Sequence, residues 1–393
     1  MAILDFKQSE GKLPIGKTLK KIGLILLILC AIGMAAYLAY SIYRSSFGTF
    51  GGYEVLSSIE KSDGGSSEYT SYKNLLLKYS RDGATAIDAQ GQYLWNGSYE
   101  MKDPVIDTCG DYVVVGDRGS KLVHLFNENG AVNSITVEHP IISVQVANQG
   151  VVAVMMEENN TIYVNMFKPN GDGFGDIKKA ISKSGFPLSM ALSNDGAKVV
   201  LSFLDIISGT LKTNIACYSF DEVGRNEDDN FVGGNIFEDE VVAKVDFITN
   251  NIVCFYKDKG FALYSMEKKL GETPIVDVVF DTSIQSIFSS SSYVGFVLDT
   301  AEEEYKYQVV VYDLKGNKVL DKGINFDYSD VNMSDTEIIF YNYSECMVMN
   351  INGKVRFQYK FEESIDAMYR ASKNKFYVVH SNSIDVIQLK GEK

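Results

Sequence analysis

Residue types that build metal and hydrolytic sites are scarce in this chain of 393 residues. Histidine occurs three times, tryptophan once, and the five cysteines include no C-x-x-C pair. Zinc sites need cysteine and histidine at short spacings, and thioredoxin-like sites need C-x-x-C, so both classes are excluded. The motifs G-x-S-x-G, H-E-x-x-H and G-x-x-x-x-G-K-[ST] are also missing. We therefore expect no catalytic residue, no cofactor and no metal.

The cysteines have no pattern of their own. Cys30 lies in a long apolar run, and the other four are dispersed at Cys109, Cys217, Cys254 and Cys346. The last three lie in apolar strand patterns, where a free thiol acts as a small hydrophobic group. A disulfide between neighbouring strands is the alternative, and the sequence leaves it open.

Proline is also scarce, with 6 residues, against 33 glycines, 24 tyrosines and 22 phenylalanines. Aromatic residues favour strands, and glycine without proline favours tight turns between them. The hydrophobic share of 46% is enough for a sizeable core and excludes a disordered chain. Many short strands are expected.

Charge is unevenly distributed, and the N-terminus has a net positive charge. The chain carries −14, but residues 1–44 hold six Lys or Arg against two Asp or Glu, a net +4, which leaves −18 for the remainder. So acidic a domain repels nucleic acid, which is excluded as a ligand. It attracts basic partners, and it also keeps an exported domain soluble.

One stretch of 22 residues, Ile22 to Tyr43, has no charged residue. As a helix it would be about 33 Å long, enough to cross a hydrocarbon layer of about 30 Å. Five lysines precede it, and tyrosines cluster at its far end. The positive-inside rule places residues 1–21 in the cytoplasm and the chain after Arg44 outside the plasma membrane. The sequence predicts a single-pass membrane protein with a signal anchor.

Two other interpretations of this stretch fit its residues less well. A cleaved signal peptide needs a shorter apolar run and a small-x-small site, and Ala39-Tyr40-Ser41 fits that site poorly. A lipoprotein would need small residues before Cys30, where residues 27–29 are Leu-Ile-Leu. An uncleaved transmembrane helix over 22–43 is the better interpretation.

An apolar run that ends in polar turn residues recurs eight times in the remainder of the chain. The runs are NLLLKYSR from Asn74, YVVVGDRG from Tyr112, VVAVMMEE from Val151, KVVLSFLD from Lys198, IVCFYKDK from Ile252, YVGFVLDT from Tyr293, EIIFYNYS from Glu337 and KFYVVHSN from Lys375.

Each copy ends at a turn glycine: Gly91, Gly130, Gly171, Gly224, Gly271, Gly316, Gly353 and Gly391. Successive glycines are separated by 39, 41, 53, 47, 45, 37 and 38 residues. A mean of about 43 residues is the length of one four-stranded blade, so the pattern predicts an all-β propeller of eight blades. Glycine after asparagine, as at Asn129-Gly130, gives the positive φ that a hairpin turn requires. Pro104, Pro140 and Pro187 precede the short runs VID, IIS and LSM, which we assign to innermost strands.

The ends of the chain bear on ring closure. The last copy has three strands, and residues 53–59, just beyond the predicted membrane helix, offer a fourth that would remove an open edge. Residues 44–70 are otherwise expected to form a linker, and 71–393 the extracytoplasmic propeller. Seven blades are the alternative, because no innermost strand of the first copy is evident.

Two segments carry a family resemblance: LLLKYSRDGATAIDAQGQYLWNGSYEMKDPVID at 75–107 and GFPLSMALSNDGAKVVLSF at 185–203. They resemble an uncharacterised family of single-pass, membrane-anchored β-propeller proteins of clostridia-like Gram-positive bacteria, over roughly 50–390. The resemblance implies the propeller fold and the cell envelope. It implies no activity and no functional residues.

The turns that follow the eight apolar runs would share one rim of a propeller, and loops on a rigid ring commonly bind partners. The candidate partner-binding residues there are Asp117, Arg118, Glu157, Glu158, Asp258, Glu302, Glu303 and Glu304. Asp and Asn also serve any hairpin turn, so a purely structural role is the competing interpretation.

Two functional hypotheses remain. The first is a membrane-tethered, noncatalytic binding or scaffolding module of the cell envelope, with a protein or glycan partner. The alternative is a propeller enzyme of the glycan lyase or hydrolase type that acts through rim carboxylates. A central pocket with two closely spaced ionisable groups of shifted pKa would favour the enzyme.

Overall fold

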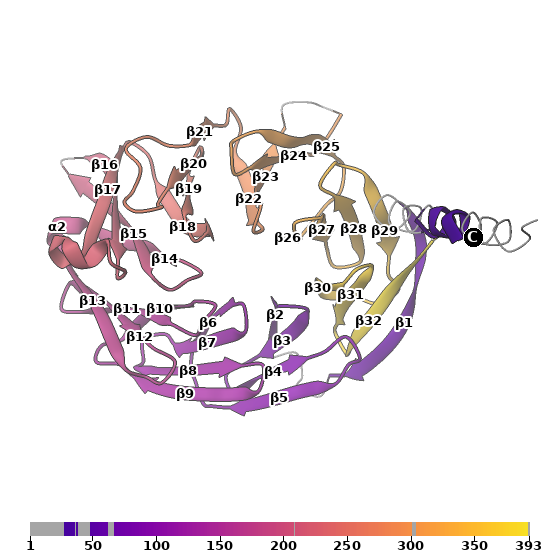
Figure 1. Ribbon diagram of the computed structural model, residues 1–393, viewed down its shortest axis with the longest axis horizontal. Helices are drawn as coiled ribbons and strands as arrows, with labels where there is room; N and C mark the ends of the chain where they lie inside the picture. The colour runs from indigo at the N-terminus through magenta and orange to yellow at the C-terminus, as the bar shows by residue number, and fades with distance from the viewer. Residues whose placement is uncertain are drawn as a thin grey trace, which may run out of the picture. The chain divides into compact units, whose positions relative to one another are not determined.

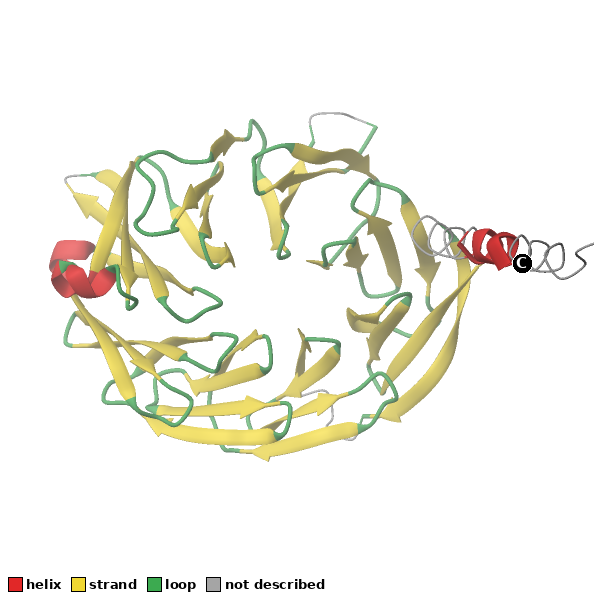
Figure 2. Ribbon diagram, viewed as in Figure 1, coloured by secondary structure: helices red, strands yellow, loops and turns green. Residues whose placement is uncertain are grey.

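The computed structural model describes residues 27–35, 37, 48–61, 67–207, 209–300 and 304–391. The chain divides into two compact units, Met1–Gly48 and Thr49–Lys393. The described residues of the second unit form eight antiparallel sheets of four strands, arranged as blades around a central axis (Figures 1 and 2). The eight-bladed all-β propeller is confirmed, and the seven-bladed alternative is excluded.

We number the blades 1 to 8 along the chain. Their innermost strands are β2 (Glu68–Tyr72), β6 (Pro104–Cys109), β10 (Ile141–Val146), β14 (Phe186–Leu192), β18 (Val242–Thr249), β22 (Ile284–Ser289), β26 (Asp330–Met333) and β30 (Ile365–Ser372). The second strands are β3 (Leu75–Tyr79), β7 (Tyr112–Asp117), β11 (Val152–Glu158), β15 (Lys198–Ile207), β19 (Ile252–Lys257), β23 (Tyr293–Asp299), β27 (Glu337–Tyr341) and β31 (Lys375–His380).

The third strands are β4 (Gly83–Ile87), β8 (Leu122–Asn127), β12 (Thr161–Phe167), β16 (Thr210–Ser219), β20 (Gly260–Ser265), β24 (Tyr307–Asp313), β28 (Glu345–Asn350) and β32 (Ser383–Gly391). The outermost strands are β5 (Tyr93–Ser98), β9 (Gly130–Thr136), β13 (Gly173–Ala180), β17 (Phe231–Glu238), β21 (Val276–Val279), β25 (Lys318–Ile324), β29 (Val355–Lys360) and β1 (Phe50–Glu60). Short helical turns in the connections are α2 (Ile181–Ser184), η1 (Gly224–Asn226) and η2 (Asp228–Asn230).

The apolar runs found in the sequence are the second strands. They lie between an inner and an outer neighbour in a sheet that is covered on both faces, so they are buried on both sides; in β27 every residue is buried. Outermost strands instead alternate buried and exposed residues, as β5 does. The proline signal was also correct: Pro104 begins β6, Pro140 directly precedes β10, and Pro187 is the second residue of β14.

The turn glycines were predicted correctly in part. Gly91, Gly130, Gly171, Gly316 and Gly353 all have positive φ, as a turn of this kind requires. The other three do not follow the pattern. Gly224 lies in the helical turn η1, Gly271 has no positive φ, and Gly391 is the last residue of β32, where it pairs with Phe50.

The ring is closed by a strand from the start of the propeller. β1 pairs antiparallel with β32, from Phe50 beside Gly391 to Glu60 beside Ser383; in Figure 1 the purple β1 lies along the yellow β32. The expected strand over 53–59 is thus part of a longer one. The innermost strand of blade 1 is β2, which begins in the predicted linker and extends past its end at residue 70; its sequence EYTSY is too polar to indicate a buried strand.

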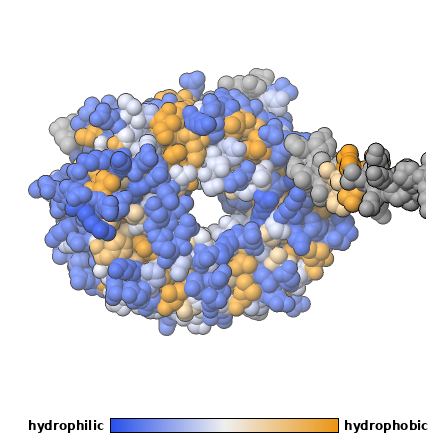
Figure 3. All heavy atoms as spheres, in the orientation of Figure 1, coloured by the Kyte–Doolittle hydropathy of each residue, from blue (hydrophilic) through white to orange (hydrophobic). Residues whose placement is uncertain are grey.

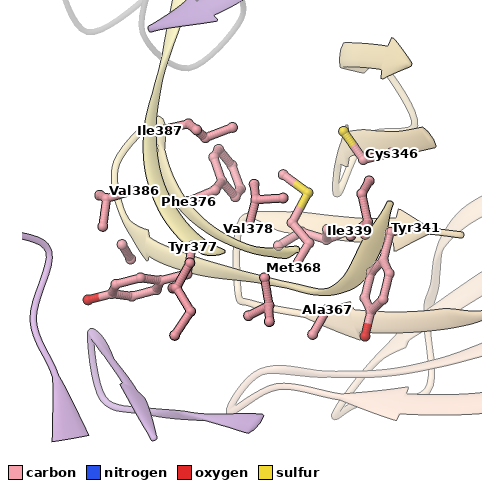
Figure 4. Packing of buried hydrophobic residues seen from close by; sticks show 14 of the residues in the cluster. Ile339, Tyr341, Cys346, Ala367, Met368, Phe376, Tyr377, Val378, Val386 and Ile387 are labelled. Carbon is pink, nitrogen blue, oxygen red and sulfur yellow. The ribbon is translucent and has the colours of Figure 1, made fainter. Parts of the chain in front are cut away.

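The core lies between adjacent blades. One cluster joins blades 7, 8 and 1, with Met368, Phe376 and Val378 at its centre (Figure 4). Tyr377 in the same cluster donates its hydroxyl proton to the carbonyl of Asn74, at 2.9 Å, and so ties blade 8 to blade 1. A fully buried aromatic ring contributes about 2–3 kcal/mol by burial. The closing junction is therefore packed like the others.

The predicted membrane helix over 22–43 lies mostly outside the described residues. Residues 27–35 and 37 are helical, and their side chains are exposed. No helix within the described part of the chain is long and apolar enough to span a bilayer.

Candidate functional site

The predicted rim residues lie at one end of the blades. The turn between second and third strands is found at this end in every blade, together with the connection to the next blade. We call this end the rim face, and the end that carries the turns between first and second strands the opposite face. The predicted residues come from blades 2, 3, 5 and 6, so the ring keeps them apart.

Asp117 is the last residue of β7, the second strand of blade 2, and Arg118 directly follows it. Asp117 is only 7% exposed, and its Oδ1 accepts hydrogen bonds from the backbone N–H groups of Lys102, at 2.9 Å, and Asp103, at 3.0 Å. Arg118 is exposed, and its Nη1 lies 3.4 Å from Oδ2 of Asp103. Asp117 therefore orders the connection between blades 1 and 2, while Arg118 is presented to solvent.

Glu157 and Glu158 end the second strand of blade 3, directly before a two-residue hairpin turn. Asn159 and Asn160 in that turn have φ of 53° and 57°, and the pair Glu158–Thr161 closes it. Positive φ at both central residues is the turn whose twist matches antiparallel strands. Within the described residues neither glutamate has a cation partner, so the turn holds two free carboxylates at a fixed place.

Asp258 begins the corresponding turn of blade 5 and is exposed. Beside it, the buried Nζ of Lys257 lies 3.2 Å from Oε1 of Glu240 and 2.7 Å from Oδ1 of Asp277. Burial lowers the pKa of Lys257, but hydrogen bonds from its ammonium to the two carboxylates outweigh that effect and raise it. Lys257 therefore stays charged and rigidly braces the turn that carries Asp258.

Glu304 is exposed at the end of the corresponding turn in blade 6, and its carbonyl accepts a hydrogen bond from Nδ2 of Asn325 at 2.8 Å. Glu302 and Glu303 lie outside the described residues. Blade 6 therefore adds one described carboxylate to the rim face.

Two cavities border the innermost strand of blade 1 on the rim face. The first, of about 350 Å³, lies between blades 1 and 2 and is lined by both signs of charge: Glu68, Arg81, Asp82, Lys102 and Asp103. The second, of about 410 Å³, lies between blades 8 and 1 and is lined by Lys61, Glu68, Tyr69, Tyr341, Asp366 and Tyr369. Both are polar hollows of the size that holds a side chain or a small ligand.

An opening passes through the centre of the ring (Figure 3). At the wall of this opening, side chains of one innermost strand form hydrogen bonds to the backbone of the next innermost strand. Asp107 Oδ2 accepts from the N–H of Val146 at 2.8 Å, and Ser189 Oγ accepts from the N–H of Val245 at 3.1 Å. These bonds satisfy backbone donors that no strand partner reaches, so they join neighbouring blades at the wall.

Three ionisable groups on this wall have shifted pKa values. Burial, with a contribution from the charge of Asp246, raises the pKa of Asp107 to about 7. Burial also raises the pKa of Asp246, which Lys244 opposes from 3.5 Å. Burial and the two carboxylates raise the pKa of Cys109 to about 12. This thiol is protonated at neutral pH and is therefore a poor nucleophile.

The described residues contain no group of three His, Cys, Asp or Glu side chains that could hold a metal ion. Cys30, Cys109, Cys217, Cys254 and Cys346 are all free thiols, so no disulfide joins neighbouring strands. Cys217, Cys254 and Cys346 are buried, as expected for small hydrophobic residues in strands.

A family model matches residues 46–389 and is described as a family of unknown function (DUF5711). The chain belongs to this family. No curated protein matches it.

Among solved structures the DUF5711 protein is similar to BamB from Moraxella catarrhalis, at a TM-score of 0.53 and 12% identity, over 86% of this chain and 100% of that one. It also matches Hsv2 from Kluyveromyces lactis, at 0.47 and 10%, over 79% and 99% of the two chains. The Pan2 WD40 domain from Neurospora crassa matches at 0.43 and 11%, over 74% and 89%. At these identities the likeness shows the propeller fold alone.

The residues that join the innermost strands were not predicted from the sequence. Asp107 and Ser189 are the polar members of the runs VID and LSM. Gln145, whose Oε1 accepts from the N–H of Leu192 in the next blade, follows IIS two residues later. A single polar residue in a short apolar run of an innermost strand was the available signal. It was overlooked because only the tertiary arrangement reveals that such a side chain faces the backbone of the next blade.

Proposed function

We propose that the DUF5711 protein is a membrane-tethered, noncatalytic binding module of the cell envelope, whose rim face docks a basic segment of another envelope protein. The observation that carries this proposal is the pair of carboxylates Glu157 and Glu158, which have no cation partner among the described residues and lie beside a rigid turn of the rim face. Asp258 and Glu304 present further exposed acidic residues from blades 5 and 6.

Rigidity supports binding at these positions. A docking surface that is already ordered loses less conformational entropy when a partner binds. The two-residue turn fixes Glu157 and Glu158, and the ion pairs of Lys257 fix the turn of Asp258. Each acidic position therefore keeps its place relative to the others.

Overall charge supports the choice of a basic partner. With −18 on the residues after 44, the domain attracts positive surfaces from a distance and speeds their encounter. This attraction is screened by salt, because the Debye length is only about 8 Å at physiological ionic strength.

The tether is the uncharged segment 22–43, with residues 1–21 in the cytoplasm and the propeller outside the plasma membrane. Its described helical residues are almost all apolar and exposed, which suits a lipid environment. The chain enters the propeller through Phe50, at the end of the blades opposite the rim face. Confinement to the membrane raises the effective concentration toward other envelope proteins, so a modest affinity suffices.

The test is crosslinking of intact, wall-stripped cells with a reagent that cannot cross membranes. We expect the full-length protein to capture a basic envelope protein, and the double variant Glu157→Gln, Glu158→Gln to capture several-fold less. Glu267→Gln, Glu272→Gln removes two exposed carboxylates from the opposite face and is the matched control. If all three proteins capture the same amount of partner and added salt does not change this amount, the rim face is not the binding surface. Failure of the reagent to label the propeller at all would overturn the topology.

The enzyme alternative has one observation in its favour: Asp107 and Asp246 are carboxyl groups of raised pKa whose charges interact. Asp107 is, however, occupied by the N–H of Val146, and Asp246 by Lys244. Both carboxyl groups are thus already engaged by other groups of the protein, so we favour the binding module. Turnover of a glycan, abolished by Asp107→Asn or Asp246→Asn, would reverse this preference.

A further inference from the structure

A third cavity, of about 470 Å³, opens on the opposite face of the propeller, between the innermost strands of blades 7, 8 and 1. Six of its lining residues carry hydroxyl or amide groups: Ser71, Asn74, Asn332, Ser334, Tyr369 and Ser372. Its volume lies within the range of about 300–1,000 Å³ that is typical of small-molecule sites. It is distinct from the rim face and plays no part in the function proposed above.

Three cations line the cavity, in a domain that is otherwise strongly acidic. Lys73 and Lys373 each precede an asparagine in the turn between first and second strands, Lys73 in blade 1 and Lys373 in blade 8. The same turn in neighbouring blades thus places two lysines at one cavity. Arg370, from the innermost strand of blade 8, is the third cation.

Arg370 is held in place by its neighbours. Its Nη1 donates to Ser334 Oγ at 3.0 Å and to Thr336 Oγ1 at 2.6 Å, both in the turn of blade 7. Its Nε lies 3.5 Å from Glu337 Oε2. Glu337 also forms a buried ion pair with Arg356, so Arg370 shares this carboxylate with a second guanidinium group.

The two lysines differ in their partners. Lys73 pairs with Asp111 and, at 3.2 Å, with Glu128, so its charge is already balanced. Lys373 is exposed and has no ion pair or hydrogen bond within the described residues. The cavity therefore combines one ammonium that has no partner among the described residues with one guanidinium that shares its carboxylate. A negatively charged ligand would provide an ion-pair partner for both groups.

We infer that this cavity binds a small polyhydroxylated anion, a sugar that carries a phosphate or a carboxylate group. The oxyanion would lie between Lys373 and Arg370, because ammonium and guanidinium donors form charge-assisted hydrogen bonds to both kinds of oxygen. The serine and asparagine side chains match sugar hydroxyls, which both donate and accept. The cavity is larger than a bare oxyanion needs, which favours a ligand with a sugar body.

The test is isothermal titration of the full-length protein in a nonionic detergent with glucose 6-phosphate, glucuronate and glucose. We expect at least one of the two anions to bind and glucose not to bind. Binding of glucose 6-phosphate alone assigns a phosphate, and binding of glucuronate alone assigns a carboxylate. Lys373→Gln should weaken binding about tenfold, as for the loss of one charge-assisted hydrogen bond.

Lys315→Gln is the matched control, because Lys315 is an exposed lysine in a turn of the same face outside the cavity. It should leave binding unchanged, as should Glu157→Gln on the rim face. Equal affinity for glucose, no binding of either anion at about 10 mM, or an equal loss in Lys315→Gln would each overturn the inference. If partner capture fails while the sugar anion still binds, the proposed function of the rim face is wrong and the inference about this cavity stands.

Discussion

Blades 2 to 5 and blades 7, 8 and 1 join their innermost strands in different ways. In the first group a side-chain oxygen accepts from a backbone N–H of the next blade, as Ser189 does from Val245. In the second group a side-chain donor binds a carbonyl of the next blade, as Asn332 Nδ2 does at Met368, at 2.9 Å. The first arrangement satisfies an N–H group that has a single hydrogen to donate, whereas a carbonyl has a second lone pair for water.

The second group also borders cavities. Three of them, of about 350, 410 and 470 Å³, border β2 or β30, while another of about 380 Å³ lies between blades 5 and 6. In the second group a buried ion pair between Arg356 and Glu337 secures the junction, and the guanidinium of Arg356 lies 5.1 Å from the ring centre of Phe50 in the closing strand. The part of the ring around the closure thus combines a buried ion pair with three cavities.

Removal of the buried charge should have the largest effect. Glu337 is 2% exposed, so Glu337→Gln removes a buried carboxylate charge that contacts both Arg356 and Arg370. We expect the free energy of unfolding to fall by about 3–5 kcal/mol. Urea denaturation followed by the fluorescence of Trp95, the one tryptophan, measures this change. Glu345→Gln, at an exposed pair of 3.9 Å with Lys360, is the control and should cost less than about 0.5 kcal/mol.

A change of pH should act on the first group through Asp107. Its pKa of about 7 in the native state exceeds about 3.9 in the unfolded chain, so between these values only the native state keeps the proton. Stability therefore falls as pH rises from 4 to 7 and then levels off. Asp107→Asn keeps an acceptor for Val146 without the charge, and should raise stability at pH 8 by about 1–2 kcal/mol and flatten this slope. A variant less stable than the parent at pH 8 would contradict the assignment.

The smallest effects compare the two kinds of junction directly. Ser189→Ala leaves the N–H of Val245 unpaired and should cost about 1–2 kcal/mol. Tyr369→Phe removes the 2.8 Å hydrogen bond to the carbonyl of Tyr69, which borders a cavity where water can replace the hydroxyl. We expect a cost below about 1 kcal/mol. Equal costs in urea denaturation would show that the two junctions do not differ.

Much of the architecture could be predicted from the sequence because the same residue pattern recurs in successive blades. The buried second strands appear as apolar runs, and glycines such as Gly316 mark turns with positive φ. β2 was missed because its polar residues give no such run. Of the predicted rim residues, Asp117 shows the limit of this approach, since it is buried and serves a neighbouring loop.

The sequence by itself determined the strands, their grouping into blades and the excess of negative charge, because these depend on local periodicity and on composition. Only the tertiary structure decided which polar residues face one another across blades. Lys73 and Lys373 are 300 positions apart in the chain, and ring closure alone places both at one cavity. No local sequence pattern predicts that these two lysines lie close together. Their proximity depends on how eight packed sheets are arranged around the ring, so that the last sheet lies beside the first.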